Sequence, residues 1–512
     1  MLRRVMIKNG WIEGLPAADP RITAFKGIPF AMPPTLSLRF HAPIPSSNWV
    51  GTMKTYHFKP ISIQPVPGID KDSIYTREWN VDPDIPMSED CLYLNVWTPA
   101  KHTDEKLPVF VWYFGGAWQV GNTAEMEFDG ERFASRGIIF VSINYRLNVF
   151  GFLSHPEITA ENPTQPGNFG LLDQQLATRW VKENIAAFGG DPDNITIGGQ
   201  SAGGGSVLLQ IASEQNKGLF QKAIIQSGVL MSPYEELVPK RTLSEAEQIG
   251  IEFFDYLKVK NLEEARALSS SYIMQKWNEY GGFNTSIKLW LPIQDGHFLK
   301  EDYIKLFLYG KRPQIPLLLG HTEDEFHTCL NMQTKEDLYK KVKELFGEDA
   351  DEFLEIIGWH ECSPDDIQKS TEIKSLEYGI RILCDNEDHL RPNINNYYYE
   401  FNPEIPGWDN PGSFHSSDLW FTFETLAKCW RPFTGKHYDL ARHMCNYWSN
   451  FIKTGNPNGI DQTGEPMPEW KPYSKEEPNK MLFTDSSHPT ITPPSLVMSF
   501  LIRNYIANYR KN

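Results

Sequence analysis

Apolar runs of strand length alternate with helical patterns, and this alternation constrains the fold of the chain most. Residues 107–118 (LPVFVWYFGGAW) and 137–146 (GIIFVSINYR) are continuous apolar segments, as expected of buried strands. Residues 171–190 have helical spacing and end at a Gly-Gly pair, and 194–201 (NITIGGQS) is again strand-like. Strands that alternate with helices predict an α/β fold in which helices flank a central, mostly parallel sheet.

The length of 512 residues is compatible with one large α/β domain or with two or three smaller ones. The chain has no internal repeat, low-complexity tract or Pro/Gly/Ser-rich linker, so we predict a single domain over residues 1–512. The segment from about 229 to 385 is richer in helical patterns and is expected to form helical cap additions over the edge of the sheet. A hairpin around Asn9-Gly10 and later strands at 315–321 and 395–401 complete the predicted elements.

The charge of the chain excludes some classes of partner. The net charge is −16, which disfavours nucleic acid and anionic membranes as partners because both require a basic face. No apolar run approaches the 18 residues of a membrane-spanning helix, and the N-terminal apolar stretch is too short for a signal peptide. We therefore expect a cytoplasmic protein. The sequence does not determine the oligomeric state, and a monomer is favoured.

The cysteines point to the same compartment. They are widely spaced and contain no C-x-x-C pair, which disfavours structural zinc. Free thiols in a reducing compartment are the simplest interpretation of the set, which comprises Cys91, Cys329, Cys362, Cys384, Cys429 and Cys445.

The stretch TIGGQSAGGG (196–205) places one serine, Ser201, among small residues. A G-x-S-x-G motif occurs by chance in many chains, and serine is also a common N-cap residue. Here, however, a strand runs directly into a helix start, which is the context required of a nucleophile elbow. Gly199 and Gly203 fit such a turn because side chains at these positions would collide. The N–H groups at the helix start favour a developing negative charge next to Ser201.

A nucleophilic serine that transfers acyl groups also needs an oxyanion hole, a base and an acid. The glycine-rich segment YFGGAW (113–118) could be a simple turn, or it could present the backbone N–H groups of Gly116 and Ala117 alongside that of Ala202. Thirteen histidines are available as the base. Glu325 and His415 follow predicted strands in the chain order serine, acid, histidine. His321 and His327 are alternatives, although their positions beside the acid suit supporting roles better.

A long, ordered series of segments resembles the type-B carboxylesterase family, which includes bacterial para-nitrobenzyl esterases, animal carboxylesterases and cholinesterases. The series covers the chain to about residue 459 and includes FKGIPFAMPP (25–34), SEDCLYLNVWTP (88–99), NYRLNVFGFL (144–153), residues 167–204, LFQKAIIQSG (219–228) and IPLLLGHTEDEF (315–326).

The resemblance implies an α/β-hydrolase fold and the hydrolysis of carboxylic esters through an acyl-enzyme. By residue-to-residue correspondence, Ser201 is the nucleophile, Glu325 the acid and His415 the base. Gly116, Ala117 and Ala202 correspond to the oxyanion hole. The resemblance further implies a structural ion pair between Glu89 and Arg146, and a serine, Ser227, near the acid.

Four positions depart from the family pattern. Phe114 stands where the family usually has histidine or tyrosine, and Phe326 follows the acid where glycine is usual. Gln200 replaces a glutamate before the nucleophile, which argues against cationic substrates. Cys91 lacks the upstream partner with which secreted members form a disulfide, in agreement with a cytoplasmic protein.

These residues predict a serine hydrolase that acts on neutral carboxylic esters with short-to-medium acyl chains or aryl groups. Phe114, Trp118 and Gln200 are the candidate pocket residues. The small-molecule ester is the expected partner, and no metal or organic cofactor is required. The same triad could instead serve an amide or carbamate hydrolase or an acyltransferase, and a non-catalytic binding homologue is a further alternative. Activity is expected to fall through roughly pH 6–7, where a histidine base becomes protonated.

Overall fold

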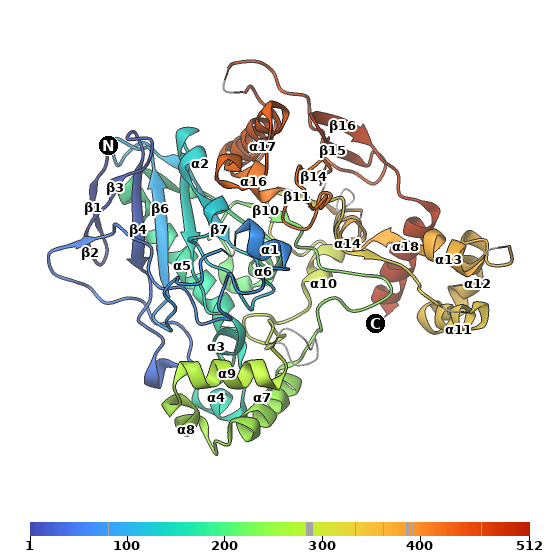
Figure 1. Ribbon diagram of the computed structural model, residues 1–512, viewed down its shortest axis with the longest axis horizontal. Helices are drawn as coiled ribbons and strands as arrows, with labels where there is room; N and C mark the ends of the chain where they lie inside the picture. Colours follow the sequence, from blue (N-terminus) through green and yellow to red (C-terminus); the bar gives the residue numbers. More distant parts are fainter. Residues whose placement is uncertain are drawn as a thin grey trace.

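The computed structural model describes the chain except for residues 80, 283–289, 333, 362, 386–389, 392, 462 and 512. The predicted N-terminal hairpin forms from β1 (Arg4–Ile7) and β2 (Gly10–Glu13), but its two-residue turn is Lys8-Asn9 rather than Asn9-Gly10, because Gly10 pairs with Ile7 as the first residue of β2. The two chain ends lie on opposite sides of the molecule (Figure 1).

One sheet runs through the molecule, and the described residues contribute eleven strands to it, in the order β16-β15-β14-β11-β10-β9-β7-β8-β6-β4-β3. The strands from β15 to β8 are parallel, whereas β16 and the β6-β4-β3 edge run antiparallel to their neighbours. This confirms the predicted α/β fold. The parallel strands are β7 (Leu107–Tyr113), β8 (Ile139–Ile143), β9 (Gly190–Gln200), β10 (Lys222–Gln226), β11 (Leu317–Thr322), β14 (Asn396–Phe401) and β15 (Asn479–Phe483); the others are β3 (Leu15–Pro16), β4 (Thr23–Pro29), β6 (Tyr93–Thr98) and β16 (Ser487–Ile491).

Both faces of the sheet are buried, which explains why its central strands read as continuous apolar runs. On β7, Phe110 and Trp112 belong to an aromatic-rich core on one face, while Val109 and Val111 belong to an aliphatic core on the other. Helix α17 (Gly435–Thr454) contributes to the first core, whereas α5 (Phe169–Asn184) and α6 (Ala202–Ala212) contribute side chains such as Val181 and Val207 to the second.

Helices within 229–385 lie on two sides of the molecule. Helices α7, α8 and α9 lie beside α4 (Pro156–Glu161) at the lower end of the view in Figure 1, whereas α11, α12 and α13 lie beside the C-terminal helix α18 (Leu496–Lys511). The division into one hydrolase domain with helical additions stays a prediction. The bounds are α7 (Leu243–Leu257), α8 (Leu262–Ala267), α9 (Ser270–Tyr280), α10 (Tyr303–Leu308), α11 (Lys335–Phe346), α12 (Ala350–Ile356), α13 (Pro364–Thr371) and α14 (Ser375–Cys384).

None of the helices described is both long enough and apolar enough to cross a lipid bilayer. Within the described residues, Cys91, Cys329, Cys429 and Cys445 take part in no disulfide. Cys362 lies outside the described residues.

A buried ion pair ties the short helix α1 (Ile74–Glu78) to the segment that follows the predicted base. Arg431 and Glu78 approach to 2.7 Å with both side chains fully buried, and the indole N–H groups of Trp420 and Trp430 also donate to Glu78. The guanidinium lies 5.4 Å from the ring centroid of Phe414, the neighbour of His415. This tether therefore connects α1 to the loop that carries the predicted base.

Replacing Arg431 with methionine leaves the Glu78 carboxylate buried without its cation, and the expected loss is about 3–5 kcal/mol of unfolding free energy. Lys182→Met removes an ion pair to the exposed Asp193 and is expected to cost at most about 1 kcal/mol. Urea denaturation followed by circular dichroism measures both variants. Equal midpoints for the two variants would contradict a stabilising role for the tether.

Candidate active site

The turn between β9 and α6 holds Ser201 in an unusual backbone conformation, with φ 56° and ψ −127°. The surrounding glycines allow it. A Cβ on Gly199 would lie 2.4 Å from the carbonyl carbon of Gly203, and a Cβ on Gly203 would lie 2.1 Å from the carbonyl oxygen of Tyr113. The strand, turn and helix therefore approach one another more closely than any side chain permits, as the motif predicts.

Ser201, His415 and Glu325 form a continuous hydrogen-bonded chain, although they are far apart in sequence. Ser201 Oγ lies 2.8 Å from His415 Nε2, and His415 Nδ1 contacts a carboxylate oxygen of Glu325. Each residue follows the carboxyl end of a parallel strand, β9, β11 or β14, so the sheet brings them to one edge. The structure thus brings together the three residues predicted from chain order.

The Glu325 carboxylate is buried and receives further donors. Ser227 Oγ donates to its Oε1 at 2.7 Å, and the backbone N–H of Thr322 donates to the same oxygen at 2.8 Å. Burial by itself would raise the pKa of Glu325, but the charge and hydrogen bond of His415, with help from Ser227, lower the pKa below its usual value. The acid is therefore held ionised and oriented. Ser227 lies next to the acid, where the family resemblance placed it.

The acid and base loops are also joined directly through their backbones. The N–H of Asp324 donates to the carbonyl of Ser413 at 3.1 Å, and the N–H of Ser413 donates to Asp324 Oδ2 at 2.7 Å. Both bonds join residues that closely precede Glu325 and His415 in the chain. The relative position of the two catalytic loops is thus set by the main chain as well as by the triad itself.

The glycine-rich segment after β7 runs against the nucleophile. A Cβ on Gly115 would lie 3.1 Å from the Cβ of Ser201. The carbonyl of Gly116 accepts hydrogen bonds from two N–H groups further along the loop, and the backbone at Gly116 (φ 107°) and Ala117 (φ 55°) is left-handed. Among the described residues, none receives a hydrogen bond from the N–H groups of Gly116, Ala117 or Ala202. These donors are available to an oxyanion.

Gln200 lies next to the imidazole of His415. Its Nε2 donates to Ser416 Oγ at 2.7 Å and lies 3.3 Å from His415 Nε2, and the side chain is buried. The position before the nucleophile therefore contacts the base with a neutral amide.

The two aromatic residues predicted to line the pocket have different surroundings. Phe114 is buried, with its ring stacked on Tyr145 at 4.3 Å, and the Tyr145 hydroxyl donates to the Phe114 carbonyl at 2.6 Å. Trp118 donates through Nε1 to Ser206 Oγ at 2.9 Å and lines a cavity of about 470 Å³. Other apolar residues that line this cavity include Leu208, Leu230, Met231, Ile293 and Leu299.

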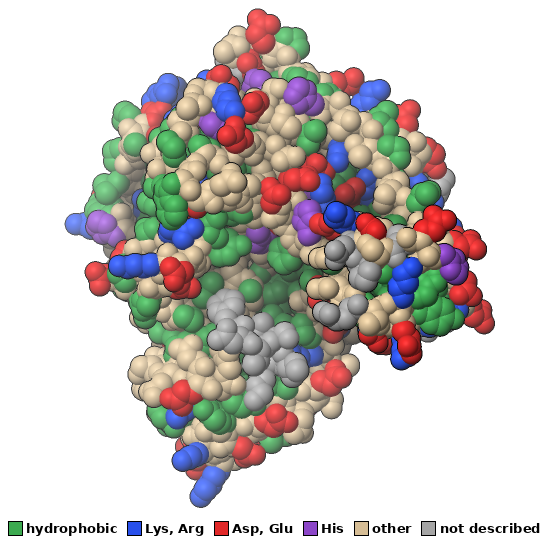
Figure 2. All heavy atoms as spheres, turned by 45° about the vertical axis from the view of Figure 1, so that its right-hand side comes forward, with side chains coloured by type: hydrophobic (Ala, Val, Ile, Leu, Met, Phe, Trp, Pro, Cys, Tyr) green, Lys and Arg blue, Asp and Glu red, His purple; other side chains and the backbone are tan. Residues whose placement is uncertain are grey.

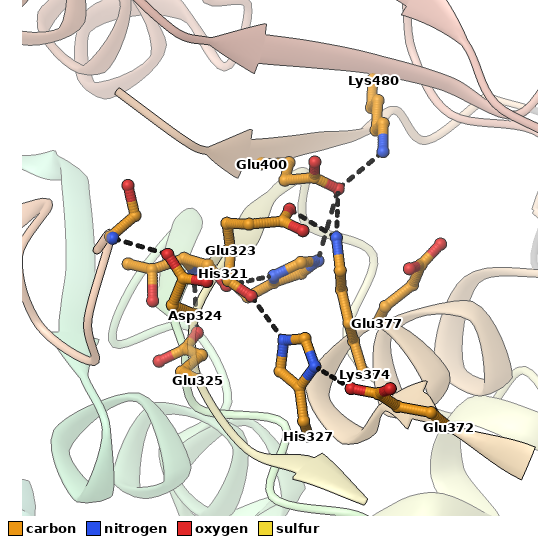
Figure 3. A network of polar contacts seen from close by, with 12 residues as sticks. His321, Glu323, Asp324, Glu325, His327, Glu372, Lys374, Glu377, Glu400 and Lys480 are labelled. Atoms are coloured by element: carbon orange, nitrogen blue, oxygen red, sulfur yellow. Dashed lines mark hydrogen bonds and ion pairs between the residues drawn. The ribbon is translucent and has the colours of Figure 1, made fainter. Parts of the chain in front are cut away.

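A buried network of charges lies behind the acid loop (Figure 3). Glu400 on β14 pairs with Lys480 at 2.6 Å and with Lys374 at 3.5 Å, and Lys374 also pairs with Glu323 at 2.5 Å. Burial would raise the pKa of Glu400, but the charges of His321, Lys480 and Lys374 lower it to about 2. The network fixes the residues on either side of Thr322, whose N–H holds Glu325.

Three members of this network, His321, Glu377 and Glu400, place potential ligand atoms within 4.8 Å of one another. Both carboxylates already form ion pairs with cationic side chains, since Glu377 pairs with Arg381 at 2.7 Å and Glu400 pairs with Lys480. His321 Nδ1 lies 2.7 Å from the Thr322 carbonyl, so this nitrogen is the donor. We interpret the cluster as an ion-pair network. His321 is thus a supporting residue of the acid loop rather than the base.

His327, the other alternative to His415 as the base, also has partners outside the Ser201–His415–Glu325 chain. His327 Nδ1 lies 2.9 Å from Glu372, and its Nε2 lies 2.8 Å from the Glu323 carbonyl.

The prediction of an ion pair between Glu89 and Arg146 is wrong. Glu89 pairs with Arg39 at 2.6 Å, and Arg146 forms a buried bidentate pair with Asp173 on α5, with a shortest distance of 2.7 Å. Asp173 is fully buried and closer to the guanidinium, so it takes the role assigned to Glu89.

Tyr75 is a neighbour of the site that sequence reasoning missed. Desolvation and the charge of Glu325 raise the pKa of this α1 tyrosine to about 12. Its segment has no strand pattern or glycine motif, so no local signal in the sequence indicated this position.

The parallel sheet, the serine elbow and the Ser-His-Glu chain at its edge define an α/β-hydrolase with a nucleophilic serine. The model of the "Carboxylesterase family" matches residues 2–493, so the chain belongs to this family.

Related proteins agree with this assignment. The human bile salt-activated lipase is 32% identical over 98% of this chain and 69% of its own length, and the acetylcholinesterase of Bungarus fasciatus is 30% identical over 96% and 84%. A Geobacillus stearothermophilus carboxylesterase structure superposes with a TM-score of 0.77 at 28% identity, over 98% of this chain and 100% of its own. The protein is therefore a carboxylic ester hydrolase with the α/β-hydrolase fold.

The neutral amide of Gln200 beside His415 leads to a prediction about the pH dependence of kcat/KM. In Gln200→Glu, a carboxylate beside His415 stabilises the protonated imidazole, so the acid limb of the kcat/KM profile should move to higher pH by about one unit. Gln200→Met removes the amide without adding charge, and its acid limb is expected to stay in place. The profile is measured with a neutral p-nitrophenyl ester between pH 5 and 9. An unmoved limb in the glutamate variant would contradict this role of position 200.

Proposed function

We propose that the protein hydrolyses neutral carboxylic esters in two steps through an acyl-enzyme on Ser201. The observation that carries this proposal is the 2.8 Å contact between Ser201 Oγ and His415 Nε2, with Glu325 on the other imidazole nitrogen. That arrangement gives a hydroxyl, a base to take its proton and an anion to stabilise the imidazolium.

In acylation, His415 accepts the proton of Ser201 as its oxygen attacks the ester carbonyl. Negative charge develops on the carbonyl oxygen, and the unengaged N–H groups of Gly116, Ala117 and Ala202 stabilise it. The imidazolium then donates its proton to the alcohol oxygen, and the alcohol leaves.

In deacylation, water replaces the alcohol, and His415 takes a proton from it during its attack on the acyl-serine. The same N–H groups stabilise the second tetrahedral intermediate, and Ser201 leaves with the proton returned by the imidazolium. Glu325 keeps the imidazole tautomer correct throughout, because its carboxylate accepts a hydrogen bond from the Nδ1–H group of His415.

The substrate class is proposed to be neutral esters with short-to-medium acyl chains or aryl groups. The cavity beside Trp118 is of the size of small-molecule sites, roughly 300–1,000 Å³, and its lining combines apolar side chains with charged ones such as Glu235, Lys240 and Asp302. A hollow with hydrophobic side chains on its walls opens on the face shown in Figure 2. Gly205, one helical turn after Ser201, and Gly228, next to Ser227, also line the cavity, so an acyl chain on Ser201 has apolar space close by. Gln200 adds no negative charge to attract a cationic substrate.

A p-nitrophenyl ester series from acetyl to octanoyl, with Ser201→Ala alongside, tests this function. Wild type is expected to turn over the series, whereas the variant should lose roughly four to six orders of magnitude in kcat because it has no nucleophile. A burst of one p-nitrophenol per Ser201 would report the acyl-enzyme directly. A folded wild type that is inactive on every chain length would overturn the proposal.

Two additional measurements distinguish the alternatives. Matched p-nitroanilides separate an amide hydrolase from an esterase, and the yield of methyl ester in added methanol measures acyl transfer. Monomeric state and cytoplasmic location stay predictions.

Trp118 is expected to set the acyl-chain limit, because its side chain lines the cavity next to Gly205 on the helix that follows Ser201; a Cβ on Gly205 would lie 3.0 Å from the ring. Trp118→Leu makes room for added methylenes, each worth about 0.8 kcal/mol when buried. The ratio of kcat/KM for octanoyl to acetyl ester should therefore rise about tenfold. The matched control is Trp408→Leu, at an exposed tryptophan that is not among the cavity residues, and its ratio should not change. A fall in activity without a change in the ratio would contradict the assignment.

A further inference from the structure

Phe326 is an exposed aromatic residue in contact with the base. It directly follows the catalytic acid, its ring centroid lies 4.9 Å from that of His415, and the two rings meet edge to face at 87°. The residue is nevertheless 38% exposed to solvent. Packing in the core therefore does not account for a ring of this size at this position.

The backbone at Phe326 is also strained. Its φ is +47°, a left-handed value that glycine adopts freely and that is uncommon for bulky residues. Neighbouring contacts hold the strained loop: the N–H of Ser375 donates to the Phe326 carbonyl at 3.0 Å, Lys374 pairs with Glu323, and His327 pairs with Glu372 (Figure 3). The ring is thus fixed beside the imidazole by the loop that carries Glu325.

The reaction places one half of the substrate at this ring. His415 Nε2 must donate its proton to the alcohol oxygen, so that oxygen comes within hydrogen-bond distance of the imidazole. The alcohol group therefore lies beside His415, whereas the acyl group remains on Ser201, next to the oxyanion N–H groups and the cavity of Trp118. An exposed side chain that contacts the imidazole is in position to meet the alcohol portion of the ester.

We infer that Phe326 is a specificity-determining residue that contacts the alcohol portion of the ester and favours aryl or other flat, apolar alcohols. This inference rests on the proposed acyl-enzyme reaction at Ser201. The exposed part of the ring offers an aromatic surface, and contacts between aromatic rings favour binding beyond simple area burial by a factor of about 3 to 10.

A purely structural role for Phe326 makes a different prediction. If the ring only shielded the His415–Glu325 contact from water, its loss would slow both chemical steps, because His415 acts in both. The alcohol has already left when deacylation begins, so a contact with the alcohol changes acylation alone. The two roles are therefore separable by kinetics.

The experiment compares wild type with Phe326→Leu on 2-naphthyl acetate and ethyl acetate, which give the same acetyl-enzyme. Intrinsic differences in leaving-group reactivity are the same for both enzymes and cancel in the comparison. We expect kcat/KM for 2-naphthyl acetate to fall about tenfold relative to that for ethyl acetate. The deacylation rate constant of the acetyl-enzyme, measured after a burst, and the acid limb of the pH profile should stay unchanged. Phe326→Tyr keeps the ring and should retain the aryl preference.

An equal fall on both acetates, a slower deacylation or a displaced pH limb would overturn the inference and assign Phe326 to positioning of the triad. Thermal unfolding of both variants confirms that the comparison is made on folded protein. Ser201→Ala, measured on the same acetates, tests the proposed function separately: a variant that still turned them over would defeat the acyl-enzyme reaction, whatever happens at position 326.

Discussion

The contact of three backbone segments at the end of β9 is the constraint on which the site depends. Gly199, Gly203 and the carbonyl of Tyr113 meet so closely that any Cβ would overlap a neighbouring atom. A side chain at either glycine would push α6 away from β7 and would move Ser201 and the Ala202 N–H relative to the oxyanion loop. The reactive serine and the donors that serve it thus share one packing requirement, which only glycine meets.

Strand order then determines which groups reach Ser201. In the sheet, β7 and β10 flank β9, so the loop after β7 brings the N–H groups of Gly116 and Ala117, and the residue after β10 brings Ser227. The next strands outward, β11 and β14, end at the acid and base loops, which Asp324 and Ser413 join directly. Every group of the proposed reaction therefore comes from the carboxyl end of a parallel strand, the end where open α/β sheets bind ligands.

The sequence predicted the parts of this arrangement that local patterns encode. The β-strands, the elbow glycines and the serine–acid–histidine order follow from apolar runs, turn residues and chain order. The buried charge network draws on residues from 321 to 480, and no local pattern links them. The error at Arg146 has another origin: its pairing with Glu89 was carried over from the family resemblance, whereas the packing of α5 places Asp173 against the guanidinium and Glu89 pairs with Arg39. Tyr75, on α1, likewise lies in a segment with no local pattern that indicates its proximity to Glu325.

Residues with a strained, left-handed backbone also cluster around Ser201. Left-handed residues other than glycine cost roughly 1–3 kcal/mol each and persist where the surroundings hold them. Several of them surround the reacting serine, and at two of these positions, Trp118 and Phe326, the side chain is a large aromatic. Glycine would relieve the strain at either position. The strain therefore argues that the aromatic rings themselves have a use: Trp118 lines the cavity proposed for the acyl chain, and Phe326 contacts the proposed base, His415. The set of left-handed residues around the site is Ala117, Trp118, Ser201, Ser227, Phe326 and Ser416.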